Sequence, residues 1–365
     1  MFDALFEPFT INGMTIDNRI VMAPMTRGFS PNGVPTKDVA NYYRARAEGG
    51  VGLIVTEGTT INHPSASADP NFPNFHAPEA LAGWEQVVAS VHDAGGKIMP
   101  QLWHMGSMRD PGQGPNPEAP SVSASGLKHP TKQNAETLGS AEIKSIVDAF
   151  AKAAYESRRL GFDGLQIHGA HGYLVDQFFW DGTNLRDDEY GGDLPNRTRF
   201  AVEIIEAIRR EVGSDFPILF RFSQWKQQDF THKMANDPDA LKDFLDPLVA
   251  AGVDCFDCST RRFWEPEFEG SAMNVAGWTK KLTGLPTVTV GSVGLDGEFV
   301  ASFQGESSNV APIDDLVDRL AAGEFDLVGV GRALLVDPQW ANKVRAGELD
   351  RLLPYTKAAV EQLVM

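Results

Sequence analysis

The segment FDGLQIHGAHGY, residues 162–173, joins a short apolar run to a turn that carries two histidines and a tyrosine. The apolar run, residues 162–167, predicts a short buried strand. His168, His171 and Tyr173 follow at the end of that strand and in the turn after it. In a barrel of alternating strands and helices, catalytic residues gather at this end of the strands. The segment therefore predicts a barrel strand with an active site at its carboxyl end.

An alternation of predicted strands and helices extends on both sides of this segment. Strands are expected at 19–24, 51–58, 97–104, 162–167, 216–223, 253–260, 285–294 and 325–335. Helices are expected at 37–50, 79–95, 140–161, 194–213, 237–252, 277–284 and 313–323, the first of them capped by Thr36. These are roughly eight strand–helix units, the content of a (β/α)8 TIM barrel of the α/β class. No linker divides the chain, so we expect residues 1–365 to form a single domain.

Two segments depart from this alternation. Residues 5–20 alternate around Asn12-Gly13, a strong hairpin signal, and we expect this N-terminal hairpin to plug the bottom of the barrel. Residues 105–139 form a long loop after the third strand, with repeated Gly, Pro and Ser and no periodic apolar face. Such a stretch is typical of a lid or of a disordered segment. Because it follows the third strand, we expect a mobile cover over the rim that carries His168.

Composition excludes several classes of protein. The chain has 365 residues, of which 42% are hydrophobic and 22% charged, as in an ordinary globular protein. A net charge of −17 argues against general nucleic-acid binding and against docking on acidic membranes. No apolar run has the length of a membrane span, and the N-terminus does not resemble a signal peptide. Together with only two cysteines, these features favour a cytoplasmic protein.

The two cysteines, Cys255 and Cys258, form a C-x-x-C pair. A redox pair or half of a metal site is one interpretation, and two buried apolar side chains are the other. Positions three apart on a strand point to opposite faces, so the sulfurs should diverge. We therefore expect two buried thiols. Four thiolates for an iron–sulfur cluster are not present in this chain.

Glycine-rich turns follow the seventh and eighth predicted strands. Gly291, Ser292 and Val293 follow one strand, and Gly331 and Arg332 follow the next. Barrels of this class often bind phosphate at these two turns, where glycine lets backbone N–H groups approach the anion. Arg332 adds a planar charged fork. Tight strand–helix turns without a ligand are the alternative, and the pair of loops favours phosphate.

Arg221 lies inside an apolar strand, in Phe220-Arg221-Phe222. An unpaired buried charge is costly, so this guanidinium should meet an anion. That anion is either a ligand or a buried carboxylate of the protein.

The central motif resembles that of a known family. His-x-x-His-Gly-Tyr-Leu begins at His168, Asn-x-Arg-x-Asp-x-Tyr-Gly-Gly begins at Asn184, and Asn-Arg-x-Arg-Phe begins at Asn196. This order resembles the signature of the Old Yellow Enzyme family of flavin-dependent ene-reductases. The resemblance extends from Arg19 to about Pro338. It implies a bound flavin mononucleotide (FMN), with NADH or NADPH as the reductant and an activated alkene as the substrate.

The resemblance assigns the cofactor site. It makes the phosphate at residues 291–293 and 331–332 that of FMN, and it places Arg221 against the flavin N1 and C2 carbonyl. Gln101 is expected at the pyrimidine edge of the ring, where an amide offers both a donor and an acceptor. Pro24, Met25 and Thr26 match a segment that touches the flavin, with the Thr26 hydroxyl tuning the redox potential. Gly58, at the end of the second strand, is also expected at the cofactor.

The resemblance also assigns chemical roles to residues of the segment 162–173. His168 and His171 are expected to donate hydrogen bonds to the substrate carbonyl oxygen, and Tyr173 to give a proton to the α-carbon. Trp103 is expected to contact the substrate. The residues alone leave a metal pair or a structural role open for the histidines, although no carboxylate or thiolate completes a metal site.

Some positions depart from the family pattern. Thr26 is combined with His171, whereas the branch with Thr usually has Asn there, and Trp103-His104 mixes two branches. Branch and substrate preference therefore stay open. Aromatic residues in 223–225 and 261–264 follow the fifth and sixth strands; they either line the pocket or cover the barrel end.

Rival functions share parts of this pattern. An amine dehydrogenase or a dienoyl reductase of the same barrel family is one alternative, and a flavin-binding redox sensor without turnover is another. His168, His171 and Tyr173 argue against a mere binder, which needs no proton donor. An aldolase-like barrel needs a lysine at a strand end, and Lys97 opens its strand at the other end. The sequence leaves monomer and homodimer equally open.

Overall fold

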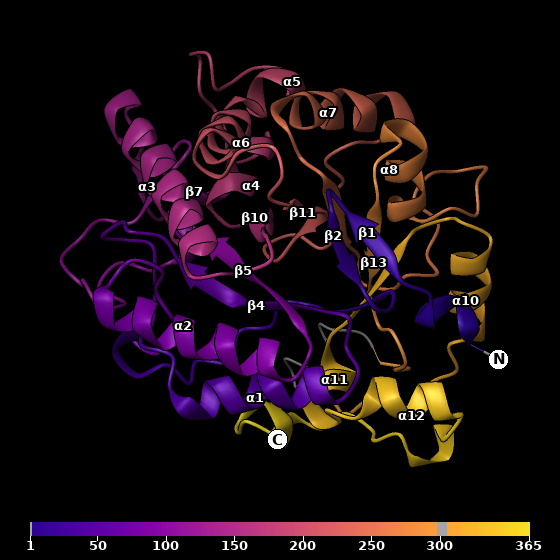
Figure 1. The fold of residues 1–365 in the computed structure, drawn as a ribbon. Coiled ribbons are helices and arrows are strands. Elements are labelled where there is room, and N and C mark those ends of the chain that lie inside the picture. Colours follow the sequence, from indigo (N-terminus) through magenta and orange to yellow (C-terminus); the bar gives the residue numbers. More distant parts are fainter. Residues whose placement is uncertain (1, 298–304) are drawn as a thin grey trace.

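The computed structural model describes residues 2–297 and 305–365. Eight parallel strands close into a barrel (Figure 1). They are β3 (Ile20–Met22), β4 (Leu53–Thr60), β5 (Lys97–Trp103), β10 (Leu165–His171), β11 (Ile218–Lys226), β12 (Cys255–Ser259), β13 (Thr287–Val290) and β14 (Leu327–Val330). The register of β14 against β3, with Val328 opposite Ile20, closes the ring. The predicted TIM barrel is confirmed.

Helices surround the barrel in the predicted alternation (Figure 1). The main ones are α1 (Lys37–Glu48), α2 (Pro78–Asp93), α3 (Ser140–Arg159), α6 (Arg199–Val212), α7 (Pro238–Ala251), α8 (Val275–Thr283), α10 (Asp314–Ala321), α11 (Arg332–Val336) and α12 (Trp340–Ala346). Thr36 caps α1 by accepting from the Val39 amide at 3.4 Å, as expected. The single helix predicted over 194–213 is divided into α5 (Leu194–Arg197) and α6, which meet at Thr198.

The N-terminal hairpin closes one end of the barrel. Strands β1 (Phe9–Ile11) and β2 (Met14–Ile16) pair antiparallel around Asn12 and Gly13, which both have positive φ. The alternation places Ile11, Met14 and Ile16 on one face, where they are buried. They share one hydrophobic cluster with inward-facing residues near the starts of the barrel strands: Val21, Leu53, Val55, Met99, Leu219, Cys255, Val288 and Leu327. The opposite, carboxyl end is therefore the one left for a site.

Cys255 and Cys258 are both free and buried. Cys255 belongs to the cluster inside the barrel, whereas Cys258 belongs to the larger cluster that includes the helices. Burial raises the pKa of both thiols, which disfavours the reactive thiolate. The prediction of two diverging, buried side chains is confirmed.

The segment 105–139 is more structured than its composition indicated. It contains η3 (Gly106–Met108) and four short strands, β6 (Val122–Ser123), β7 (Leu127–His129), β8 (Lys132–Gln133) and β9 (Glu136–Thr137). Strands β6 and β9 pair, as do β7 and β8. Arg186 of the central motif donates to the carbonyl oxygens of Ala124 and Leu138 at 2.8 and 2.7 Å, which ties the segment to the barrel. The segment is the long loop expected after the third strand, but these short strands and polar contacts hold it in place, and neither is visible as a sequence period.

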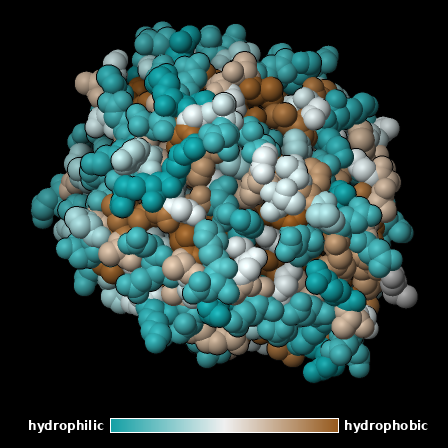
Figure 2. Space-filling view, viewed as in Figure 1, coloured by the Kyte–Doolittle hydropathy of each residue, from teal (hydrophilic) through white to brown (hydrophobic). Residues whose placement is uncertain are grey.

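The outer surface is mainly hydrophilic in the face shown, with scattered hydrophobic patches (Figure 2). Among the helices of the described residues, none is long and apolar enough to cross a membrane.

Candidate active site

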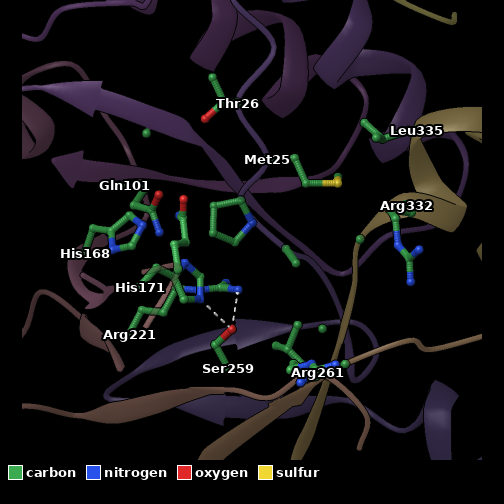
Figure 3. Close-up of a pocket in the computed structure, with 18 of the residues that line it drawn as sticks. Met25, Thr26, Gln101, His168, His171, Arg221, Ser259, Arg261, Arg332 and Leu335 are labelled. Carbon is green, nitrogen blue, oxygen red and sulfur yellow. Dashed lines mark hydrogen bonds between the residues drawn. The ribbon is translucent and has the colours of Figure 1, made fainter. Parts of the chain in front are cut away.

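A cavity of about 460 Å³ opens at the carboxyl ends of the barrel strands. This volume is in the range of small-molecule and cofactor sites. Every site residue expected from the sequence lines it: Pro24, Met25, Thr26, Gly58, Gln101, Trp103, His168, His171, Tyr173, Arg221, Gly291, Ser292, Val293, Gly331 and Arg332. Figure 3 shows two ends, with Gln101, both histidines and Arg221 gathered on one side and Arg332 on the other. The parallel barrel brings these distant segments together.

The Arg332 end has the features of an anion site. Gly291 has φ 152°, and a Cβ there would lie 2.5 Å from Oγ1 of Thr260, so only glycine fits. Ser292 has φ 49°, and its Oγ accepts from Arg332 at 3.3 Å. The Arg332 guanidinium also donates to the carbonyl oxygen of Gly297 at 2.5 Å. A turn this tight beside a guanidinium fits a phosphate group.

A chain of polar side chains lies under the other end of the cavity. Nε2 of Gln101 donates to Oε1 of Gln166 at 2.8 Å, and Nε2 of Gln166 donates to Oδ2 of Asp257 at 2.8 Å. The same carboxylate oxygen accepts from Nη1 of Arg221 at 2.8 Å. Arg221 therefore meets a protein carboxylate, the alternative that the sequence left open, and it lines the cavity as well.

Two polar atoms of these hydrogen-bonded side chains have no partner within the protein. Among the described residues, Nε of Arg221 and Oδ1 of Asp257 are buried without a hydrogen-bond partner. Burial raises the pKa of Asp257, and Arg221 opposes that shift. A buried polar group without a partner is costly, so an N–H of Arg221 beside the cavity fits a ligand with a polar or anionic edge. The ring of a flavin has such an edge.

The two histidines are neutral donors in this arrangement. Nδ1 of His168 accepts from the amide of Ala170 at 3.3 Å, which leaves the ring proton on Nε2. Nε2 of His171 lies 2.8 Å from Oγ of Ser259, and that hydroxyl accepts from Arg221 at 3.2 Å (Figure 3). Because a guanidinium only donates, the Ser259 proton can point to His171, whose own proton is then on Nδ1. Burial, and next the charge of Arg221, lower the pKa of both imidazoles well below 6.5.

Tyr173 is held between aromatic rings. Its ring makes edge contacts with Trp103 and His168, each at a centroid distance of 4.9 Å. Burial raises the pKa of the phenol, so the hydroxyl keeps its proton at neutral pH. Gly58 faces Trp103, and a Cβ there would lie 2.6 Å from the indole. The glycine therefore has a packing reason in addition to any contact with a cofactor.

The structure also settles which aromatic segments reach the cavity. Trp225 and Arg261 line it, and the ring of Trp225 stacks on that of His171 with a distance of 4.6 Å between the ring centroids. Phe263 and Trp264 do not line it. Of the long segment 105–139, Met105 alone is a lining residue, so the expectation that this segment covers the rim holds only at its first residue.

A C-terminal segment that was not expected at the site covers part of the cavity. Tyr355, Lys357 and Val360 line it near Arg332. Arg27 holds this segment by donating to the carbonyl oxygens of Ala359 and Gln362 at 2.9 and 2.6 Å. The residues have no regular apolar period, so no sequence signal pointed to them.

Comparison with known proteins agrees with this geometry. The family model of the NADH:flavin oxidoreductase / NADH oxidase family matches residues 4–350. NADH oxidase from Thermoanaerobacter brockii is 34% identical over 363 residues, which cover 96% of this chain and 52% of that protein. The 12-oxophytodienoate reductase 1 of Oryza sativa subsp. japonica is 37% identical over 249 residues, 66% of this chain and 63% of that protein. The chain thus spans between half and two thirds of the length of these relatives.

A solved structure is similar over nearly the whole chain. The old yellow enzyme homologue from Zymomonas mobilis superposes with a TM-score of 0.80 at 27% identity, covering 99% of this chain and 96% of that one. The chain therefore belongs to the NADH:flavin oxidoreductase / NADH oxidase family, the Old Yellow Enzyme family of flavin-dependent oxidoreductases, and its cofactor is FMN.

Proposed function

We propose that this protein is an ene-reductase. It takes hydride from NADH or NADPH and delivers it, through FMN, to the activated C=C bond of an α,β-unsaturated carbonyl or nitro compound. The observation that carries the proposal is the convergence of two neutral imidazoles and a protonated phenol on one side of the cavity. FMN would supply the hydride step; the protein supplies the hydrogen bonds and the proton.

The protein residues available to hold FMN divide between the two ends of the cavity. Arg332 and the turn at residues 291–293 would hold the phosphate, and the guanidinium beside this tight turn supports that assignment. Gln101 and Arg221 would meet the polar edge of the ring, and Thr26, which also lines the cavity, would offer it a hydroxyl. In this assignment the Asp257 carboxylate fixes Arg221 and, through Gln166, Gln101.

His168 and His171 would bind the oxygen of the substrate. Negative charge grows on that oxygen as hydride arrives at the β-carbon, and two donors placed in advance stabilise it. Their lowered pKa values keep them neutral through the working pH range, so each offers one N–H rather than a charge. Tyr173 would then protonate the α-carbon, and Trp103, whose ring contacts that of Tyr173, would contact the substrate.

Replacing the proton donor tests this proposal. In Tyr173→Phe, reduction of the flavin by the nicotinamide should stay near normal, since that half-reaction needs no proton from the phenol. Reoxidation by an unsaturated ketone should slow by about 10²–10⁴-fold, the usual contribution of general acid catalysis.

Nitroalkenes provide the matched control. Their nitronate product is stable enough to take a proton from solvent, so the variant should reduce them nearly as fast as the parent does. Stopped-flow traces of the two half-reactions measure both rates. If nicotinamide oxidation collapses while ketone reduction survives, Tyr173 is not the acid.

A flavin-binding redox sensor is the alternative from another class. A sensor has no need of a phenol held beside two donors, and the family relatives are named as an oxidase and a reductase. Turnover of an enone by the purified protein separates the two functions.

A further inference from the structure

A tight turn at the end of β11 contacts the segment that carries Tyr173. Lys226 and Asp229 exchange backbone hydrogen bonds, each at 3.1 Å, so Gln227 and Gln228 lie at the tip of the turn. The Gln227 side-chain amide donates to the Tyr173 hydroxyl at 3.2 Å. The Gln228 side-chain amide donates to the carbonyl oxygen of Gly172, also at 3.2 Å. Two neighbouring glutamines therefore hold two neighbouring residues, Gly172 and Tyr173, of the segment 162–173.

A fully buried ion pair anchors this turn. Nζ of Lys226 lies 2.5 Å from Oδ1 of Asp176, and neither side chain is exposed to solvent. The other carboxylate oxygen of Asp176 accepts from the amide of Gly172 at 2.6 Å. The carboxylate thus joins the turn of β11 to the turn after β10. Separation of these two turns would leave a buried charge without a partner, which is strongly unfavourable.

The turn after β10 needs such support because its backbone is strained. His171 has φ 65° and Gly172 has φ 78°. A non-glycine residue in this conformation persists only where its surroundings determine it. At Gly172, a Cβ would lie 2.0 Å from Oε1 of Gln228, so the turn of β11 also fits closely against this backbone.

The amide of Gln227 fixes the direction of the phenolic proton. Among the described residues, it is the only hydrogen-bond partner of the Tyr173 hydroxyl. An amide N–H can only donate, so it occupies a lone pair of the oxygen and leaves the O–H of Tyr173 for another acceptor. Trp103 and His168 fix the ring itself, and both Gln227 and Tyr173 line the cavity.

We propose that Gln227 is the positioning residue of the acid: it directs the proton of Tyr173 toward the substrate and stabilises the phenolate that remains. This inference rests on the proposed function, in which Tyr173 is the proton donor. After hydride adds to the β-carbon, the O–H bond breaks and a C–H bond forms at the α-carbon. The electron pair of the O–H bond stays on the phenolic oxygen, where the Gln227 hydrogen bond becomes charge-assisted and stronger, until water returns the proton.

The test compares Gln227→Met with Gln228→Met in the FMN-loaded protein. Gln227→Met keeps the length of the side chain and removes the donor, so reoxidation by an unsaturated ketone should slow roughly tenfold, the effect of one lost hydrogen bond that strengthens in the reaction. Reduction by the nicotinamide and reoxidation by a nitroalkene should stay within about twofold. Gln228→Met removes a donor from the same turn without touching the phenol, and it should change the ketone and nitroalkene rates by the same factor.

Two further variants complete the experiment. Gln227→Lys restores an N–H donor and should recover most of the ketone rate, which a merely structural loss would not allow. In a Tyr173→Phe background, Gln227→Met should have no further effect on ketone reduction, because its partner is absent. If Gln227→Met lowers both acceptor rates equally, or still slows the Tyr173→Phe variant, the inference is wrong. If Tyr173→Phe alone leaves ketone reduction unchanged, Tyr173 is not the acid and the inference about Gln227 falls with it. If the parent protein reduces no unsaturated ketone, the proposed function fails instead.

Discussion

The buried carboxyl of Glu57 on β4 allows a quantitative test of the loop at residues 24–28. Its Oε2 accepts from the amides of Arg27 and Gly28 at 2.8 and 3.0 Å. Among the described residues its Oε1 is buried without a partner. Burial raises the pKa of Glu57 to about 7, although the two backbone hydrogen bonds oppose the shift. At neutral pH this side chain is therefore close to half protonated.

The sign of the effect on stability follows from this raised pKa. The folded state holds the Glu57 proton more tightly than the unfolded state, whose pKa is near the ordinary 4.5. The stabilisation is therefore fully present below pH 4.5 and is lost as pH rises through about 7. Moving a carboxyl pKa from 4.5 to about 7 corresponds to about 3 kcal/mol of unfolding free energy.

Glu57→Gln removes this titration and keeps an oxygen acceptor for both amides. Any fixed cost of the new NH₂ group is the same at every pH. The unfolding free energy of the variant minus that of the parent should therefore be about 3 kcal/mol larger above pH 7 than below pH 4.5.

Urea unfolding of the FMN-saturated proteins across this pH range measures the difference. His63 and His232, whose pKa values burial lowers to about 4, lose their contribution as pH falls below 6.5. Both proteins contain these histidines, so their effect cancels. Stability curves that stay parallel at every pH would refute the reasoning, because Glu57 would then titrate alike in both states.

Three other changes test separate parts of the site. Arg332→Gln should weaken FMN binding at least about tenfold, measured as flavin fluorescence released on dialysis, and full retention would remove Arg332 from the phosphate site. Replacing His168 and His171 together by Ala should abolish the long-wavelength charge-transfer band with phenols while FMN stays bound; a band at unchanged affinity would contradict the donor role. Lys226→Met should lower the unfolding free energy by about 3–5 kcal/mol, since it leaves Asp176 buried and unpaired, and a loss below about 1 kcal/mol would show that the pair is dispensable.

The barrel could be predicted because its signals are local. The alternating pattern of residues 5–20 around Asn12-Gly13 predicted the hairpin. Segments with a helical apolar period, separated by short apolar runs, predicted the strand–helix units. Residues at strand ends, such as His168 and Arg332, share one end of a parallel barrel, so their meeting followed from the topology. All the expected site residues do line one cavity.

Contacts across strands could not be predicted in the same way. Gln166, Asp257 and Ser259 support Arg221 and His171, yet each is an ordinary polar residue within an apolar run. Their pairing depends on the register of neighbouring strands, which the sequence does not state. The C-terminal segment at residues 355–360 was missed for a related reason. Arg27 holds it through a backbone carbonyl oxygen, and such a contact leaves no side-chain pattern in the sequence.

The glutamines of the β11 turn show a further limit. Gln227 and Gln228 look alike in sequence, and only the backbone turn at Lys226 and Asp229 decides which amide meets the phenol. The chemical roles given to His168, His171 and Tyr173 remain predictions until kinetics test them.

Anaerobic double mixing tests the central claim most directly. The yellow protein is first reduced by NADH or NADPH and then mixed with one equivalent of an α,β-unsaturated ketone, while flavin absorbance and product are followed. We predict that the absorbance bleaches with the nicotinamide, returns fully with the ketone, and yields one saturated ketone per FMN. A flavin that is reduced normally but stays bleached with the ketone, or a protein that binds no FMN, would contradict the account.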